Sequence, residues 1–341
     1  MKGSGFISSG SYGCVNDPPV KCETNVDKNK KYYKNTVGKY FNRSSSALDE
    51  YKAQQKIKEI DSRSEWTLPL YKKCIISDFT KLDEAEQCEY IGEKGEKYLQ
   101  LIFKNGGVDL DTIIDRFSTS SNEIKMKQFL KVFKVIKPVL KGLKILNERG
   151  YCHLDIKPGN ILFDGKKLSV IDFGLLTKSE NIYKSTSQQF LLFSYPYYPP
   201  EFKLFGQWLN KKDKMKKNTF INSFKKNIDT SDANIIWPEF DENLSHFHAI
   251  LSHHTDNFTS TTLMEKEFLS FKEKIDIYSF GFTLLEFYQS MIVRDNMITL
   301  LIHNLLLKMI KLNPYERIYW DKIIEEYEMI EKVSKYFSKK G

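Results

Sequence analysis

The arrangement of apolar and polar residues changes along the chain, and the change divides it into two parts. In about the first hundred residues, short apolar runs alternate with turns. This predicts strands at 37–41 and 98–103 and one helix at 47–60, with serines at 44–46 as its cap. From residue 129 to residue 146, apolar side chains recur every three or four positions, which predicts one long helix that stops near Gly150.

Glycine-containing turns mark the connections between the remaining elements. Asn105-Gly106-Gly107 ends the strand at 98–103 and predicts a hinge. Asp164-Gly165 separates short apolar segments at 160–163 and 168–171 and predicts a small hairpin. The spacing of apolar residues at 320–337 predicts a last helix. A strand-rich first part, a hinge and a helical second part together predict an α+β protein of two lobes.

Composition narrows the class of protein. Hydrophobic residues make up 41% of the 341 residues, which is typical of a folded globular protein. No apolar run reaches the length of a membrane span or of a signal-peptide core, so we expect neither. The five cysteines are odd in number and contain no C-x-x-C pair. They predict neither a disulfide framework nor a thiolate zinc site and favour a reducing, intracellular compartment.

Positive charge is concentrated in one segment. The formal net charge is +8, and a dense lysine cluster lies between Lys203 and Lys226. A solvated surface excursion is the favoured interpretation, and the alternative is a site for an anionic partner such as nucleic acid or an acidic protein. Four histidines follow at 246, 248, 253 and 254. Without cysteine or carboxylate partners they are more typical of a surface than of a metal site.

One stretch combines side chains that suit phosphoryl transfer. The run His153-Leu154-Asp155-Ile156-Lys157-Pro158-Gly159-Asn160 is followed by Asp172-Phe173-Gly174. Oxygen atoms of Asn160 and Asp172 are the kind of ligand that Mg²⁺ prefers. The Asp155 carboxylate can orient a hydroxyl group and accept its proton. Lys157 can neutralise charge on a transferring phosphoryl group.

In this order and at this separation, the two motifs resemble those of the eukaryotic-type protein kinases. The resemblance implies Asp155 as the catalytic base, Lys157 on the γ-phosphate, and Asn160 and Asp172 as Mg²⁺ ligands. It also implies ATP and Mg²⁺ as cofactors and a bilobal protein-kinase fold. We expect a β-rich N-lobe with one main helix at 1–104, and a mostly α-helical C-lobe at 105–341 with an insertion at about 203–271.

The N-lobe would hold the nucleotide. The stretch from Ser8 to Val15 is similar to the glycine-rich loop of the family, with Ser8 in place of the first glycine and Gly10 and Gly13 at the other two. By the same resemblance, residues 101–105 would read the adenine edge. The residues implied on the two faces of the adenine ring are Val15 and Val37 above and Leu162 below.

Two lysines are candidates for the phosphate anchor. Lys21 follows Pro18-Pro19-Val20, whereas Lys39 lies in a strand-like segment ahead of the predicted helix. We prefer Lys39, because the family pairs this lysine with a glutamate on that helix, which here is Glu50.

Three downstream motifs indicate a protein substrate rather than a small metabolite. The stretch from Ser194 to Glu201 resembles the substrate-binding loop that ends in A-P-E, here P-P-E, and 276–281 resembles the D-x-x-S-x-G helix start. Arg317 resembles the arginine that pairs with the glutamate of that loop. Lys157-Pro158 and the hydroxyl of Ser194 match the Ser/Thr-specific pattern.

Leu154 replaces the arginine that the family carries before its catalytic aspartate. Without that arginine there is no positive charge for a phosphate to neutralise, so we predict activity without activation-loop phosphorylation. Hydroxyl groups available as sites are those of Ser179, Ser185, Thr186 and Ser187.

The finer resemblance is to kinases encoded by large nucleocytoplasmic DNA viruses, which would place the protein in the cytoplasm of a host cell. It rests on the Gly-Ser-Tyr-Gly-Cys-Val and D-F-G-L-L-T-K runs. Three alternatives stay open at this point: a kinase fold that binds ATP without turnover, a small-molecule phosphotransferase, and a nucleic-acid-binding protein that uses the lysine cluster.

Overall fold

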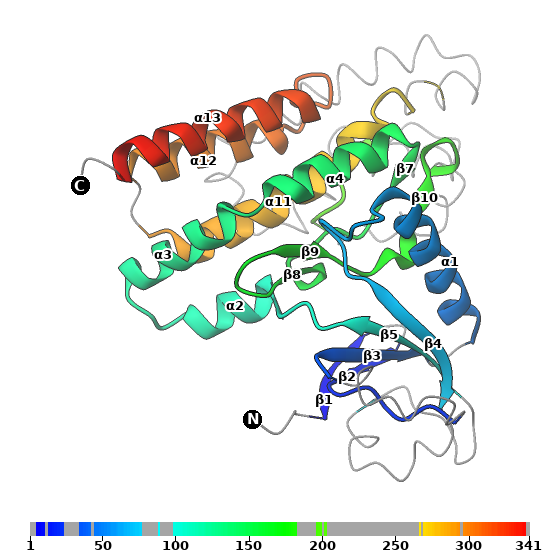
Figure 1. Cartoon of the computed structure of the whole chain (residues 1–341). Helices are drawn as coiled ribbons and strands as arrows, with labels where there is room; N and C mark the ends of the chain where they lie inside the picture. Colours follow the sequence, from blue (N-terminus) through cyan, green and yellow to red (C-terminus); the bar gives the residue numbers. More distant parts are fainter. Residues whose placement is uncertain are drawn as a thin grey trace, which may run out of the picture. The chain divides into compact units, whose positions relative to one another are not determined.

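The computed structural model describes residues 5–10, 13–23, 34–41, 44–76, 88, 98–182, 196–199, 201–202, 266, 269–293 and 296–338. The chain divides into two compact units (Figure 1). The N-terminal unit contains residues 1–107 together with 168–174, and the C-terminal unit contains residues 108–167 and 175–341.

A five-stranded antiparallel sheet forms the N-terminal unit, in the order β1-β2-β3-β5-β4. Its strands are β1 (Phe6–Gly10), β2 (Gly13–Asn16), β3 (Thr36–Phe41), β4 (Leu70–Ile76) and β5 (Tyr98–Lys104). Helix α1 (Ser44–Ile60) packs on the sheet through a core of Phe41, Ala47, Leu101 and Phe103. The predicted strands at 37–41 and 98–103 and the predicted helix are confirmed. The helix begins at Ser44, so the serines form its first turn.

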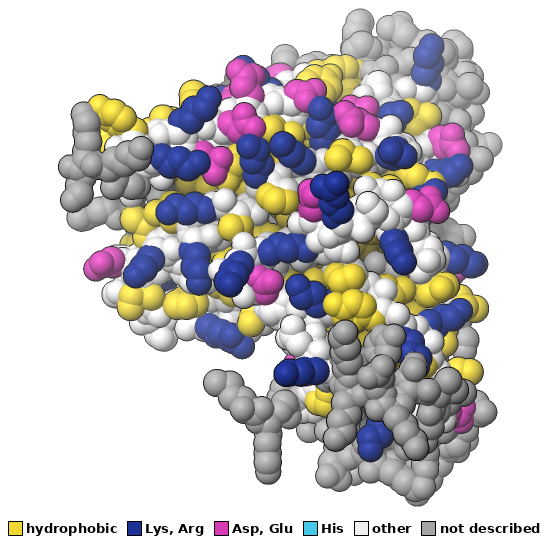
Figure 2. Space-filling model, in the orientation of Figure 1, with side chains coloured by type: hydrophobic (Ala, Val, Ile, Leu, Met, Phe, Trp, Pro, Cys, Tyr) yellow, Lys and Arg dark blue, Asp and Glu magenta, His cyan; other side chains and the backbone are white. Residues whose placement is uncertain are grey.

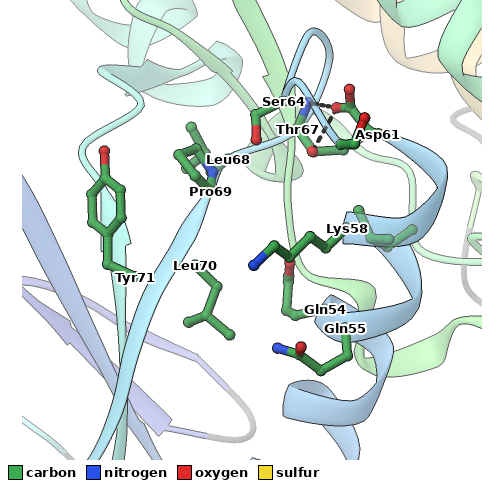
Figure 3. A pocket seen from close by; sticks show the side chains of 12 residues that line it. Gln54, Gln55, Lys58, Asp61, Ser64, Thr67, Leu68, Pro69, Leu70 and Tyr71 are labelled. Carbon is green, nitrogen blue, oxygen red and sulfur yellow. Dashed lines mark hydrogen bonds between the residues drawn. The ribbon is translucent and has the colours of Figure 1, made fainter.

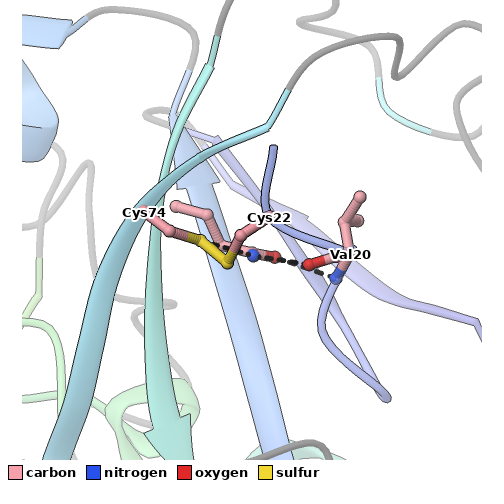
Figure 4. Close-up of a disulfide and its surroundings, with 4 residues drawn as sticks. Val20, Cys22 and Cys74 are labelled. Carbon is pink, nitrogen blue, oxygen red and sulfur yellow. Dashed lines mark hydrogen bonds between the residues drawn. A yellow bond between two sulfur atoms is a disulfide. The ribbon is translucent and has the colours of Figure 1, made fainter. Parts of the chain in front are cut away.

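Two disulfides lie in this unit, and the prediction that the cysteines form none was wrong. Cys14 pairs with Cys88, and Cys22 pairs with Cys74 (Figure 4), with Cα–Cα distances of 6.1 and 5.8 Å in the usual range for disulfides. The partners are 74 and 52 positions apart in sequence, so no short Cys spacing predicts these disulfides. The inference of a reducing compartment therefore loses its support. Among the described residues, Cys152 is the free cysteine, and it is buried.

The C-terminal unit is mainly helical. Its helices are α2 (Leu110–Phe117), α3 (Asn122–Phe133), α4 (Lys137–Glu148), α11 (Lys272–Met291), α12 (Met297–Met309) and α13 (Trp320–Ser338). Helix α11 is buried along nearly its whole length, and the core of the unit surrounds it. The helix predicted at 320–337 is confirmed. The single helix predicted through 129–146 is wrong: it is interrupted at 134–136 and restarts with Pro138 in its first turn, where a missing N–H costs nothing.

Short strands and 3₁₀ turns connect these helices. Strand β6 (Val108–Asp109) pairs with β8 (Ile161–Phe163), and β7 (Tyr151–Cys152) pairs with β10 (Thr177–Lys178). The 3₁₀ turns are Pro158–Asn160, Phe173–Leu175 and Ser179–Asn181, and strand β9 (Leu168–Val170) belongs to the N-terminal unit. The hairpin turn predicted at Asp164-Gly165 is present: Asp164 accepts hydrogen bonds from two following amides, and Gly165 has φ 94°.

Charges of both signs are interspersed on the surface of the helices (Figure 2). Ion pairs join α13 to its neighbours, for example Lys137 with Glu328 and Lys308 with Glu326. Within the described residues, no helix combines the length and the apolar character needed to span a bilayer. The lysine cluster and the four histidines at 246–254 lie outside the described residues.

Candidate active site

The glycine-rich segment forms the hairpin of β1 and β2. Ser8 pairs with Val15 and Gly10 with Gly13, and residues 11–12 between them lie outside the described residues. A Cβ atom at Gly13 would overlap the carbonyl group of Tyr40 on β3. Glycine is therefore required here by the close approach of two strands.

A glutamine fixes the segment that follows the hairpin. Gln100, fully buried on β5, accepts a hydrogen bond from the Val20 amide at 2.9 Å and donates one to its carbonyl at 2.8 Å. The amide head lies against Gly38, where any Cβ atom would overlap it. Gly38, next to Lys39, thus makes room for the contact that holds residues 18–20 on the sheet.

Lys39 lies between two carboxylates. Its Nζ is 3.1 Å from Glu50 Oε2 on α1 and 3.0 Å from Asp172 Oδ1, and all three residues belong to the N-terminal unit. Burial by itself would lower the pKa of Lys39, but Asp172 and Glu50 outweigh it and hold the pKa above its ordinary value. Burial raises the pKa of Glu50, and the Lys39 ammonium opposes that shift. Lys21, the alternative anchor, is exposed.

The loop after α1 supports the strand that leads to Asp172. The Asp61 carboxylate accepts hydrogen bonds from three consecutive backbone amides, 65–67, and from the Thr67 hydroxyl, at 2.7–3.1 Å. The Trp66 carbonyl in this loop in turn accepts a hydrogen bond from the Val170 amide at 2.9 Å. The Trp66 ring meets Phe173 edge to face, with ring centroids 6.1 Å apart.

Between α1 and β4, this loop closes one end of a pocket of about 220 Å³ (Figure 3). Gln54 and Lys58 of α1 line one side, and Leu68 to Tyr71 line the other. The Asp61 carboxylate at its end is already occupied by the four hydrogen bonds to the loop, so it offers little capacity for a ligand.

In the C-terminal unit, three predicted residues meet around one carboxylate. Asp155 Oδ2 is 3.1 Å from Lys157 Nζ and accepts a hydrogen bond from Asn160 Nδ2 at 2.8 Å. The same amide nitrogen donates to the Asp155 carbonyl at 2.8 Å. The nitrogen of Asn160 is therefore committed to Asp155, and its Oδ1 is the atom left with ligand capacity. Leu162 lies half-buried on β8.

The backbone ahead of Asp155 is held in an uncommon conformation. Leu154 has φ 65°, and Asp172 has φ 62°, a region that costs a side-chain-bearing residue about 1–2 kcal/mol. The buried Asp276 carboxylate accepts hydrogen bonds from the amides of His153, at 3.0 Å, and Leu154, at 3.3 Å. These bonds compensate for the strained turn. The D-x-x-S-x-G motif pointed to Asp276, whereas no sequence motif pointed to Asp61 or Gln100.

The predicted pair of Arg317 and Glu201 is confirmed. The guanidinium meets the carboxylate in a bidentate contact of 2.6 and 3.0 Å, and both side chains are 0% exposed. The expectation that Ser179 is available for phosphorylation was wrong. Ser179 is 2% exposed, and its hydroxyl contacts the Cys152 thiol. Residues 185–187 and 194 lie outside the described residues.

Comparisons with known proteins give matches to protein kinases. Residues 86–216 match the protein kinase domain family. The mitosis inhibitor protein kinase SWE1 of Candida albicans is 37% identical over 83 residues, covering 24% of this chain and 6% of that protein. The serine/threonine-protein kinase ifkB of Dictyostelium discoideum is 24% identical over 200 residues, covering 58% and 12%. The serine/threonine-protein kinase 040L of Invertebrate iridescent virus 3 is 29% identical over 140 residues, covering 37% and 41%. The aligned segments thus span less than half the length of each relative.

Proposed function

We propose that this chain, which belongs to the eukaryotic-type serine/threonine protein kinases and resembles viral members, transfers the γ-phosphate of ATP to Ser or Thr hydroxyls of proteins. The observation that carries the proposal is the Lys39 ammonium held between Glu50 and Asp172. A half-buried lysine held by two carboxylates is a fixed cation suited to the phosphates of a nucleotide.

Each of the two residues implied as magnesium ligands offers, within its own unit, an oxygen atom of the kind that Mg²⁺ prefers. Mg²⁺ takes one or two protein oxygens and completes its shell with phosphate oxygens and water. Asp172 and the free Oδ1 of Asn160 would be its protein ligands, and the ion would neutralise charge on the phosphates. Among the described residues, no group of three or more acidic, His or Cys side chains suits a different metal.

The chain's own side chains would then carry out the following steps. Asp155, oriented by its hydrogen bond from Asn160, accepts the proton of the substrate hydroxyl. Lys157, whose Nζ is 3.1 Å from Asp155 Oδ2, neutralises charge on the phosphoryl group during its transfer. By the resemblance, backbone amides of the glycine-rich segment would face the phosphates, and Val15, Val37 and Leu162, each half-buried within its own unit, would contact adenine.

The test measures phosphate transfer to a protein or peptide library with MgATP, together with nucleotide affinity. We expect Asp155→Asn to lower turnover about 100-fold or more and to leave nucleotide affinity within about twofold. Lys39→Met should lose activity, and the matched control Lys21→Met should keep it. Binding of MgATP without any transfer by the unmodified protein would show a non-catalytic nucleotide-binding module instead.

We further infer that activity does not require phosphorylation of the activation loop. Leu154 is 4% exposed and carries no charge, so the turn at this position is held by Asp276 without a cation that a phosphate must neutralise. Alanine at 185, 186 and 187 together should retain activity. A folded triple variant that lost activity, and regained it with acidic residues at these positions, would refute the inference.

A further inference from the structure

Asn147, on α4, makes a set of directional hydrogen bonds close to residues 153–160, which we call the catalytic loop. Asn147 is 2% exposed. Its Nδ2 donates to Asp276 Oδ2 at 2.9 Å and to the Tyr151 carbonyl at 2.9 Å. Its Oδ1 accepts the indole N–H of Trp320, from the first residue of α13, at 2.7 Å. Both ends of a buried amide are thus used.

Trp320 determines which way this amide points. An indole nitrogen can only donate, so it must face the oxygen of Asn147 and not the nitrogen. The nitrogen is then turned toward the Asp276 carboxylate, which can only accept when it is ionised. A flipped amide would place two oxygens against each other and an N–H against another N–H. Trp320 therefore selects the orientation that satisfies Asp276.

Asp276 passes this orientation to the catalytic loop. Burial raises the pKa of Asp276, and the hydrogen bonds from His153, Asn147 and Leu154 oppose the rise and favour the carboxylate. Two of these donors are the backbone amides directly ahead of Asp155, one of them in the strained Leu154 turn. Removing the Asn147 donor leaves the Asp276 carboxylate with the two backbone amides of His153 and Leu154 as its remaining donors and removes the side-chain contact that holds Oδ2 in place.

We propose that Asn147 and Trp320 are positioning residues for Asp155, acting through Asp276 and the Leu154 turn. The proposal rests on the proposed kinase function for its kinetic consequence, but the hydrogen-bond network can be tested without it. Through this network, Trp320 at the start of helix α13 helps to hold the reactive Asp155 carboxylate in place. None of the sequence motifs contains this connection.

The experiment compares four variants by kinetics and by amide hydrogen exchange. Asn147→Ala removes the amide, and Trp320→Phe keeps an aromatic ring but loses the N–H donor. Asn147→His is the conservative rescue, because a neutral imidazole offers one donor and one acceptor. Leu143→Ala, buried on the same helix and unable to hydrogen-bond through its side chain, is the control for destabilisation by a cavity.

We expect Asn147→Ala to lower kcat about tenfold or more with KM for ATP within about twofold, since a displaced reactive group slows the reaction and leaves nucleotide binding intact. Trp320→Phe should lower kcat in the same direction, and Asn147→His should restore most of it. In Asn147→Ala and Trp320→Phe, the amides of His153 and Leu154 should exchange faster by about tenfold, but not in Leu143→Ala.

The proposal is overturned if exchange at His153 and Leu154 is unchanged in both network variants, or if Leu143→Ala lowers kcat equally. A protein without any phosphotransfer would instead remove the proposed function, and the exchange data would still decide whether the network holds the turn.

Discussion

Breaking the pair of Arg317 and Glu201 should destabilise the C-terminal unit more than most single substitutions. Both side chains are fully buried, and the guanidinium also donates to the carbonyls of Lys274 and Lys311, each at 3.0 Å. Glu201→Gln would leave a buried cation near Lys274, whose pKa is already lowered to about 8 by burial and by Arg317. Removing one partner of a buried ion pair typically costs about 3–5 kcal/mol.

That cost is large against the total stability of a domain, which is about 5–15 kcal/mol. At about 2–4 °C per kcal/mol, we expect Tm to fall by about 6–20 °C in Glu201→Gln and in Arg317→Met, as measured by thermal unfolding at neutral pH. The double variant Glu201→Leu with Arg317→Met should be more stable than either single one, because no buried charge is left alone. Single substitutions that each cost less than about 1 kcal/mol, or effects that simply add, would refute this reasoning.

Two further predictions concern the disulfides and pH. Reduction, or the variant Cys22→Ser with Cys74→Ser, should lower the stability of the N-terminal unit, since closing a loop of 52 residues contributes up to about 4 kcal/mol by the chain-entropy relation. Non-reducing peptide mapping together with unfolding curves measures this loss. Free thiols at all five cysteines of the native protein, rather than at Cys152 alone, would contradict the prediction. Burial, and then Glu286, Asp109 and Asp115, raise the pKa of Asp111 to about 6. A raised folded-state pKa contributes stability below the unfolded value of about 4, and this is lost as pH rises through 6. Asp111→Asn should therefore reduce the loss of stability between pH 4.5 and 7.5 by about 1 kcal/mol, after allowing for solvent screening of this exposed residue. Urea unfolding across this pH range measures the effect. An equally steep fall of the urea midpoint in the variant would count against the shift.

The elements predicted correctly are those whose signal is local. The periodicity of the α1, β3, β5 and α13 segments lies within one helix or strand, and each folds as its pattern indicates. The break between α3 and α4 was missed, although Pro138 signals it, because proline cannot donate the backbone hydrogen bond of a helix interior. Apolar spacing continued through the break and concealed it.

Contacts between distant segments were predictable only where a family motif supplied them. The pairing of Arg317 with Glu201 came from resemblance, since nothing in the two local sequences specifies a partner 116 positions away. The disulfides carry no such motif. Neither do Gln100 and Asn147, whose roles depend on which atoms lie opposite them in the folded sheet and helices. An isolated Asn or Gln in a sequence is most often a surface residue.

Two residues with strained backbone conformations explain why polar side chains that no sequence motif predicts lie next to the candidate site. Leu154 and Asp172 both have left-handed backbone conformations, and each adjoins or supplies a carboxylate assigned to the reaction. Such a conformation persists only when the surroundings over-determine it. Asp276 fixes the first through backbone amides, and Lys39 holds the second by a 3.0 Å contact. Each holder is itself braced, by Asn147 in one unit and by Glu50 in the other. Substitutions in these outer residues should therefore act on catalysis through backbone geometry, which is why residue type and spacing alone do not reveal them.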